Sequence, residues 1–144
     1  MPAPKRKDPY ENFNFRVEID GIMQAGFSEV SVLETIVDVV EYREGIELSH
    51  VRKLPGRVRY GNVVLKWGVT NSQELYNWWK GVRDGNVIRK NMSVILIDQQ
   101  RNDVKRWTVR EAWPAKYQVG PLNAKGNDVL IEELVIANEG MELE

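Results

Sequence analysis

Residues 13–21 read Phe-Asn-Phe-Arg-Val-Glu-Ile-Asp-Gly, a pattern that indicates a β-strand followed by a turn. Apolar side chains occupy every second position as far as Ile19, with polar or charged residues between them. Alternate side chains of a strand lie on opposite faces, so the pattern predicts a half-buried strand with an aromatic inner face. The dipeptide Asp20-Gly21 can supply the positive φ angles of a type I′ turn. We therefore expect the chain to fold back from Ile22 as a hairpin partner.

The next stretches carry apolar residues on both strand faces. Residues 26–29 interrupt the alternation as a β-bulge does, and residues 36–42 then place valine, isoleucine or tyrosine on each side. Residues 92–97 and 129–137 repeat this two-faced character. An antiparallel strand with one face in water does not look like this. We expect the protein's own helix or another subunit to cover the second face.

One helix is predicted over about residues 72–83. Its apolar side chains follow the i, i+3, i+4, i+7 spacing of one helix face, and Asn71 or Ser72 can cap its first turn. Asp84-Gly85 supplies the stop. Two adjacent tryptophans on that face can bury a large area, so the helix is expected to pack on the sheet and anchor the core. The predicted core anchors are Phe13, Phe15, Leu75, Trp78 and Trp79.

The length of the chain predicts a single domain over residues 1–144. Further strands are expected at residues 63–67, 87–98, 104–113 before a bend at Pro114, and 128–138. With roughly seven or eight strands at hairpin spacing and one helix, the fold class is mainly β. We expect an antiparallel β-sandwich or small barrel with one packed helix.

Two segments lack a core pattern. Residues 1–9 are rich in proline and basic residues and are predicted to form a flexible leader. Residues 43–59 are rich in charge, glycine and proline, and form a connection too long for a tight turn. We interpret this connection as an assembly arm. The candidate subunit or ring interface consists of Tyr42, Arg43, Glu44, Ile46, Glu47, His50, Arg52, Lys53, Leu54 and Arg57.

The sequence offers no catalytic, cofactor-binding or metal-binding constellation. There is no cysteine, and His50 is the single histidine, so a metal site would have to rely on carboxylates. Ser49 beside His50 makes no triad, because a base must be placed by the fold and oriented by a third group. Glu132 and Glu133 are neighbours on a strand and point to opposite faces, which favours solvated or interface charges. We expect no enzyme and no cofactor.

An oligonucleotide-binding module is the alternative function. A small barrel with aromatic and basic side chains is a common platform for single-stranded nucleic acid. The formal net charge of −1 argues against affinity for a phosphate backbone. The aromatic residues also occupy the alternate strand positions that carry other apolar side chains, which favours a core role for most of them.

Several longer motifs resemble the tail tube proteins of contractile-tailed phages and, more closely, the inner tube proteins of extracellular contractile injection systems and related tailocin-like particles. The resemblance extends from Asp8 to Glu144. The motifs that carry it, in chain order, are residues 12–21 (NFNFRVEIDG), 25–30 (AGFSEV), 41–45 (EYREG), 52–56 (RKLPG), 112–117 (AWPAKY), 122–124 (LNA) and 139–140 (EG).

The resemblance implies a fold shared with the haemolysin-coregulated protein of type VI secretion, in which six copies form a ring and stacked rings form a hollow tube. It implies as partners other copies of the same chain, a contractile sheath protein, baseplate or spike proteins and a tail terminator, with payload or DNA passing through the lumen. It also implies that an extended loop at residues 43–59 contacts neighbouring subunits. No apolar run is long enough to cross a bilayer, so we expect assembly in the cytoplasm and no membrane insertion.

Overall fold

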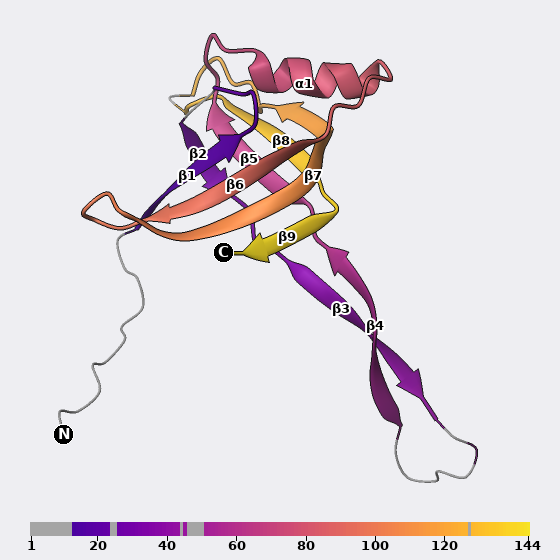
Figure 1. Cartoon of the computed structure of the whole chain (residues 1–144). Helices are drawn as coiled ribbons and strands as arrows, with labels where there is room; N and C mark the ends of the chain where they lie inside the picture. Colours follow the sequence, from indigo (N-terminus) through magenta and orange to yellow (C-terminus); the bar gives the residue numbers. More distant parts are fainter. Residues whose placement is uncertain (1–12, 24–25, 44, 46–50, 127) are drawn as a thin grey trace, which may run out of the picture.

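A computed structural model describes residues 13–23, 26–43, 45, 51–126 and 128–144 (Figure 1). The described residues form mainly strands and one helix, as the sequence predicts. The elements are β1 (Asn14–Ile19), β2 (Phe27–Val30), β3 (Thr35–Tyr42), β4 (Arg52–Tyr60), β5 (Val63–Gly68), α1 (Glu74–Arg83), β6 (Lys90–Ile97), β7 (Asp103–Val119), β8 (Ile131–Ala137) and β9 (Gly140–Leu143).

The body of the protein is one curled antiparallel sheet in the order β1-β6-β7-β8-β5-β2, with β9 also paired to β7. The first part of β7 pairs with β6 and β9, and residues 113–119 pair with β8. Because one long strand belongs to both halves, the sheet folds over itself and encloses a core. The end strands β1 and β2 do not pair with each other in the described part of the chain, so the sheet is not a closed barrel.

The core follows the alternation of the strands. Val63, Leu65 and Trp67 on β5 are buried, with less buried residues between them, as period two predicts. On β1 the predicted inner face is only partly correct. Val17 and Ile19 are buried and Phe15 packs against the core, but Phe13 precedes the strand and is 58% exposed. The prediction of Phe13 as a core anchor is therefore wrong.

The predicted hairpin after β1 is also wrong. Asp20-Gly21 does form a turn, with φ of 75° at Gly21, and the amide of Ile22 donates to the carbonyl of Ile19 at 3.0 Å. Among the described residues of the return segment, pairing is limited to a single bridge between these two residues. Instead β1 pairs with β6 along its whole length. Turn chemistry sets a local reversal, but a distant apolar strand supplies the more favourable partner.

Helix α1 lies across one end of the curled sheet (Figure 1). Leu75 and Trp78 are buried against the sheet, and Trp79 is partly buried at its margin. The helix begins at Glu74, two residues later than predicted, and its N-cap residue is Gln73, without a side-chain cap hydrogen bond. Asp84 is the C-cap and Gly85 follows with φ of 90°, as the predicted stop requires.

Strand β7 continues past the predicted bend. Pro114 lies inside the strand, at a register shift between Pro114 and Lys116 in its pairing with β8. A bulge is a place where a strand tolerates proline, because one residue there is left out of the hydrogen-bonded ladder. The predicted bulge at residues 26–29 is confirmed by the register shift between Phe27 and Glu29.

Glu111 lies at a register shift in the pairing of β7 with β6, two residues before the part of β7 that pairs with β8, and its φ of 53° is unusual for a residue with a Cβ. Glycine adopts this conformation without the steric cost of about 1 kcal/mol or more that other residues meet. We therefore expect Glu111→Gly to raise the free energy of unfolding by about 0.5 to 1 kcal/mol, measured by urea denaturation. Lys105→Gly, at an exposed position of the same strand with ordinary φ, should lower it by about 0.5 to 1 kcal/mol. Equal changes in the free energy of unfolding from the two variants would contradict backbone strain at Glu111.

Candidate assembly interface

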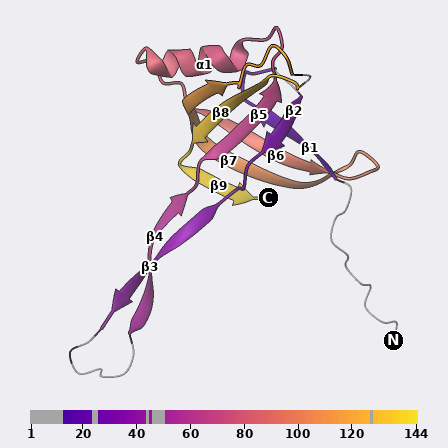
Figure 2. The same cartoon turned by 180° about the vertical axis from the view of Figure 1, so that it is seen from behind.

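Strands β3 and β4 form a separate two-stranded ribbon that projects from the body (Figures 1 and 2). The last part of the predicted connection, residues 52–59, is thus strand, since β4 runs from Arg52 to Tyr60. The sequence shows no alternation here because neither face of the ribbon is buried, and nearly every β4 residue is exposed. We call the paired strands β3 and β4 the assembly ribbon.

The assembly ribbon is apolar without having a core. Its half-exposed apolar side chains, between 46% and 64% exposed, are Val37, Val39, Val40, Tyr42, Leu54 and Val58. An isolated two-stranded hairpin is marginally stable in water, and one with this much exposed apolar surface needs a partner surface.

Cross-strand register assigns these side chains to the two faces of the ribbon. Val37 lies opposite Val58 and Val39 opposite Pro55, and alternate residues of β3 share a face. Val37, Val39 and Pro55 line one shallow apolar depression. We call this set the valine face. The opposite face includes Val40, which lies opposite Leu54.

Close packing holds the two strands together at a bulge. The pairing shifts between Val37 and Val39, so β4 carries extra residues there. A Cβ on Gly56 would lie 2.7 Å from a methyl carbon of Val40, closer than side chains pack, so a larger residue here would force Val40 to shift. The Arg59 guanidinium lies 2.8 Å from the Asp38 carboxylate across the strands.

The assembly ribbon brings together several of the predicted interface residues. Tyr42 lies opposite Arg52, Lys53 lies opposite Glu41, and Leu54 lies opposite Val40. Arg57 falls within the bulged part of β4, and Arg43 directly follows β3. Glu44, Ile46, Glu47 and His50, like the leader at residues 1–9, lie outside the described residues. The candidate interface included only Tyr42 of β3, although the two-faced pattern of residues 36–42 had already predicted cover by a helix or another subunit.

A second surface carries paired charges on the outer face of β1, β6, β7 and β9. Arg16 lies 2.9 Å from Asp103, Arg106 lies 3.4 Å from Glu18, and these pairs connect β1 to β7 across β6. Ile95 lies opposite both arginines in the register and has no exposed surface. The aliphatic stems of the arginines therefore cover this residue. Cover by the helix or a neighbouring subunit, as predicted for residues 92–97, is not needed at Ile95.

The hydrogen bonds from Arg16 lower the pKa of the Asp103 carboxyl group below its ordinary value. The depressed pKa means that the pair stabilises the fold above the unfolded-state pKa and loses that effect as the pH falls. We expect Arg16→Gln to raise the pKa of Asp103, measured by NMR titration of its carboxyl carbon. Arg110→Gln, whose partner is Glu142 on the same sheet, is the matched control and should leave it unchanged. If the pKa of Asp103 were the same in Arg16→Gln as in the parent, the ion pair would be absent in solution.

A buried polar pair lies beneath helix α1. The Tyr117 hydroxyl donates to a carboxylate oxygen of Glu132 at 2.8 Å, and Glu132 is only 7% exposed. Burial, followed by this hydrogen bond, raises the pKa of Tyr117 to about 12, so the hydroxyl stays protonated as a donor. The prediction that Glu132 is a solvated or interface charge is wrong. Glu133 points the other way, so the two carboxylates do not form a catalytic pair.

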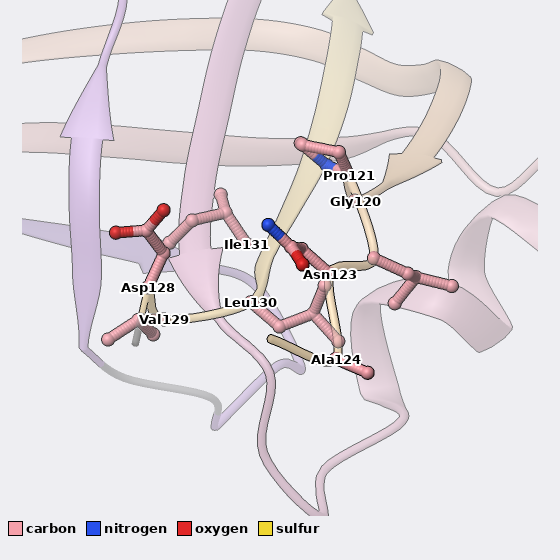
Figure 3. Close-up of a pocket in the computed structure, with 9 residues that line it drawn as sticks. Gly120, Pro121, Asn123, Ala124, Asp128, Val129, Leu130 and Ile131 are labelled. Carbon is pink, nitrogen blue, oxygen red and sulfur yellow. The ribbon is translucent and has the colours of Figure 1, made fainter. Parts of the chain in front are cut away.

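The loop between β7 and β8 borders a pocket of about 530 Å³ (Figure 3). Gly120, Pro121 and Asn123 line it from one side, and Val129 and Ile131 from the other. Asp128 is the one carboxylate among its lining residues, which include no nucleophile or second acid to act with it. The pocket does not support a hydrolytic mechanism.

The described residues provide little for other chemistry. Among residues 13–144, apart from those outside the description, no cluster of three or more histidine or acidic side chains could hold a metal ion. The helix found in the described part is too short to cross a membrane. Trp67 and Trp78 are buried, which leaves these two rings unable to stack on bases.

The curled sheet, the single end helix and the projecting ribbon define the class of protein: a small, mainly β structural subunit. A family model described as T4-like virus tail tube protein gp19 matches residues 11–142. The chain belongs to this family. Because the family consists of structural tail tube proteins, the chain is a structural protein and not an enzyme. No curated protein matches the chain significantly.

Solved structures share the fold. A chain in the anti-feeding prophage (AFP) baseplate is 26% identical, with a TM-score of 0.79 over 100% of this chain and 97% of that one. A chain in the sheath-tube complex of the extracellular contractile injection system PVC is 24% identical, with a TM-score of 0.82 over 94% and 91%. Hcp1 from Flavobacterium johnsoniae is 20% identical, with a TM-score of 0.62 over 90% and 93%. The predicted resemblance in family and in fold is confirmed.

Proposed function

We propose that this chain is the subunit of the hollow inner tube of a contractile, phage-tail-like injection system. Six copies form a ring, the rings stack, and payload or DNA passes along the lumen. The subunit is a rigid wall element that acts through self-assembly and needs no cofactor. Assembly takes place in the cytoplasm, and the tube becomes part of a phage tail or a released particle.

The observation that carries this proposal is the exposed apolar assembly ribbon. In a monomer the valine, leucine and tyrosine side chains of the ribbon are half exposed to water on both faces, so they add no stability through burial. The same ribbon stabilises an assembly when it buries those side chains against another copy, at about 25 cal/mol per Å² of apolar surface. Closed symmetry also protects strands whose free edges would otherwise pair with other chains.

The other proposed partners follow from the proteins that share the fold. One of them occurs in a sheath-tube complex and another in a baseplate. We place a contractile sheath around the tube of this protein, a baseplate or spike at one end and a terminator at the other. The sheath drives the tube through a target envelope, and this subunit contributes stiffness and a channel.

Negative-stain electron microscopy of the purified protein tests the proposal. We expect rings with six subunits, and tubes at higher protein concentration. Association between subunits becomes more favourable as the protein concentration rises. A labelled single-stranded oligonucleotide added to the same sample should show no mobility shift at physiological salt. A monomer that shifts the oligonucleotide and forms no rings would support the oligonucleotide-binding alternative instead.

A further inference from the structure

An apolar groove of about 520 Å³ lies between the end strands β1 and β2 of the curled sheet. We call it the β1–β2 groove. Its polar border includes Ser28 and Glu29. Neither β1 nor β2 pairs with a second strand among the described residues. The side chains that make the groove apolar are Phe13, Phe15, Val30, Leu33, Leu96 and Trp107.

The two ends of the core differ in how well they are covered. Burial along β1 increases toward helix α1, since Phe13 is 58% exposed whereas Val17 and Ile19 are buried. Beyond β1 the chain reaches the helix, where the Met23 amide donates to the Glu74 carboxylate at 2.8 Å. Figure 1 shows the first residues of β1 at the end of the sheet away from α1. The helix therefore covers one end of the core, and the β1–β2 groove lies open at the other.

The chain itself supplies an occupant that starts at the rim of this groove. Residues 1–12 lie outside the described residues, and they end directly before Phe13, whose ring lines the groove. Their one aromatic residue, Tyr10, precedes Phe13 by three positions, so the two Cα atoms are at most about 11 Å apart. A tyrosine ring can cover an apolar surface while its hydroxyl stays in water.

Charge and proline content favour the same occupant. Residues 1–12 carry a formal net charge of +1, from Lys5, Arg6 and Lys7 against Asp8 and Glu11. The segment 13–34, which contains β1 and β2, carries −3, from Arg16 against Glu18, Asp20, Glu29 and Glu34. Opposite charges favour contact between the two segments. The prolines at positions 2, 4 and 9 lack an amide donor, so a segment laid along the groove offers a poor edge for further strands.

We propose that residues 1–12 fold back over the β1–β2 groove of the same copy, and that the Tyr10 ring covers Phe13 and Trp107 there. The leader then completes the core at the end that α1 leaves open. An ordered leader takes the place of the flexible one predicted from the sequence. This inference concerns the single subunit and goes beyond the proposed function, which does not depend on it.

The absence of cysteine allows a direct test by disulfide cross-linking. Asp8→Cys combined with Ser28→Cys places one thiol in the leader and one at the border of the groove. The protein is oxidised at a concentration at which electron microscopy shows neither rings nor tubes. Docking raises the effective thiol concentration, so the intramolecular disulfide should form at least about tenfold faster than in the control. The control combines Asp8→Cys with Val32→Cys, because Val32 is exposed and does not line the groove.

A second measurement tests the aromatic contact without cross-linking. Tyr10→Ser should shift the indole N–H resonance of Trp107 in a ¹H–¹⁵N NMR spectrum, because Trp107 lines the groove and loses a ring beside it. Tyr10→Phe keeps the ring and should leave this resonance close to its position in the parent. The indole N–H of Trp78, which donates to the Ile88 carbonyl near α1, is the internal control and should not shift in either variant.

The outcomes separate the inference from the proposed function. Equal cross-linking at Ser28 and Val32, or a Trp107 resonance unchanged in Tyr10→Ser, would show that the leader does not occupy the groove. Cross-links between copies that increase with protein concentration would place the leader on a second copy and overturn the assignment to the same copy. Each of these results leaves the tube function standing. That function fails if the parent forms neither rings nor tubes at high concentration.

Discussion

Trp78→Ala is expected to lower the free energy of unfolding by about 3 to 5 kcal/mol, the range for truncating an enclosed large aromatic side chain. Trp78 is 7% exposed and packs in the core cluster beneath α1. Its indole N–H also donates to the carbonyl oxygen of Ile88 at 2.7 Å. The variant loses the packing and leaves that carbonyl without this donor, so both effects act in the same direction.

Urea denaturation followed by circular dichroism measures this effect. Trp79→Ala is the informative comparison, because Trp79 is only partly buried and its ring lies tilted against the rings of Tyr76 and Tyr117. It should cost less than Trp78→Ala, roughly 1 to 2 kcal/mol from lost aromatic contacts and partial burial. Val87→Ala, at a half-exposed position, should change stability by less than about 0.5 kcal/mol. If Trp78→Ala melted like the parent, the assignment of α1 as the core anchor would be wrong.

Shortening the assembly ribbon should abolish tube formation and leave the monomer intact. We would replace residues 39–56 by Asn-Gly, which removes the ribbon beyond the pairing of Val37 with Val58. No buried core residue lies among the described residues in that range, and a shorter loop changes closure entropy only slightly. The free energy of unfolding should therefore stay within about 1 kcal/mol of the parent. Electron microscopy at a concentration where the parent forms tubes should show none.

The matched control leaves the ribbon intact and removes an exposed charged pair elsewhere. Arg110→Gln combined with Glu142→Gln removes such a pair between β7 and β9 on the body of the protein. Exposed pairs of this kind contribute about 1 kcal/mol or less, so this double variant should still form tubes. Tubes of normal length from the shortened protein would refute the role of the ribbon in assembly.

Sequence patterns predicted the features that depend on one buried face. The helix at Leu75 and Trp78 was predictable because its apolar spacing matches the helical repeat, and β5 because its alternation matches the strand repeat. The position of β4 was not predictable, because a ribbon exposed on both faces leaves no period in the sequence. The candidate interface residues stay a prediction, and the expected irregular connection is a strand over residues 52–60.

Local periodicity and motifs in fixed order were enough to predict the mainly β class, one helix, most of the core and the family to which the chain belongs. The pairing of β1 with β6, the position of Phe13 at an open groove and the projection of β3 and β4 as a ribbon became clear from the three-dimensional structure. Alternation indicates which side chains are buried, but it does not indicate which distant strand buries them. Pairing between residues far apart in the chain depends on how whole faces fit together.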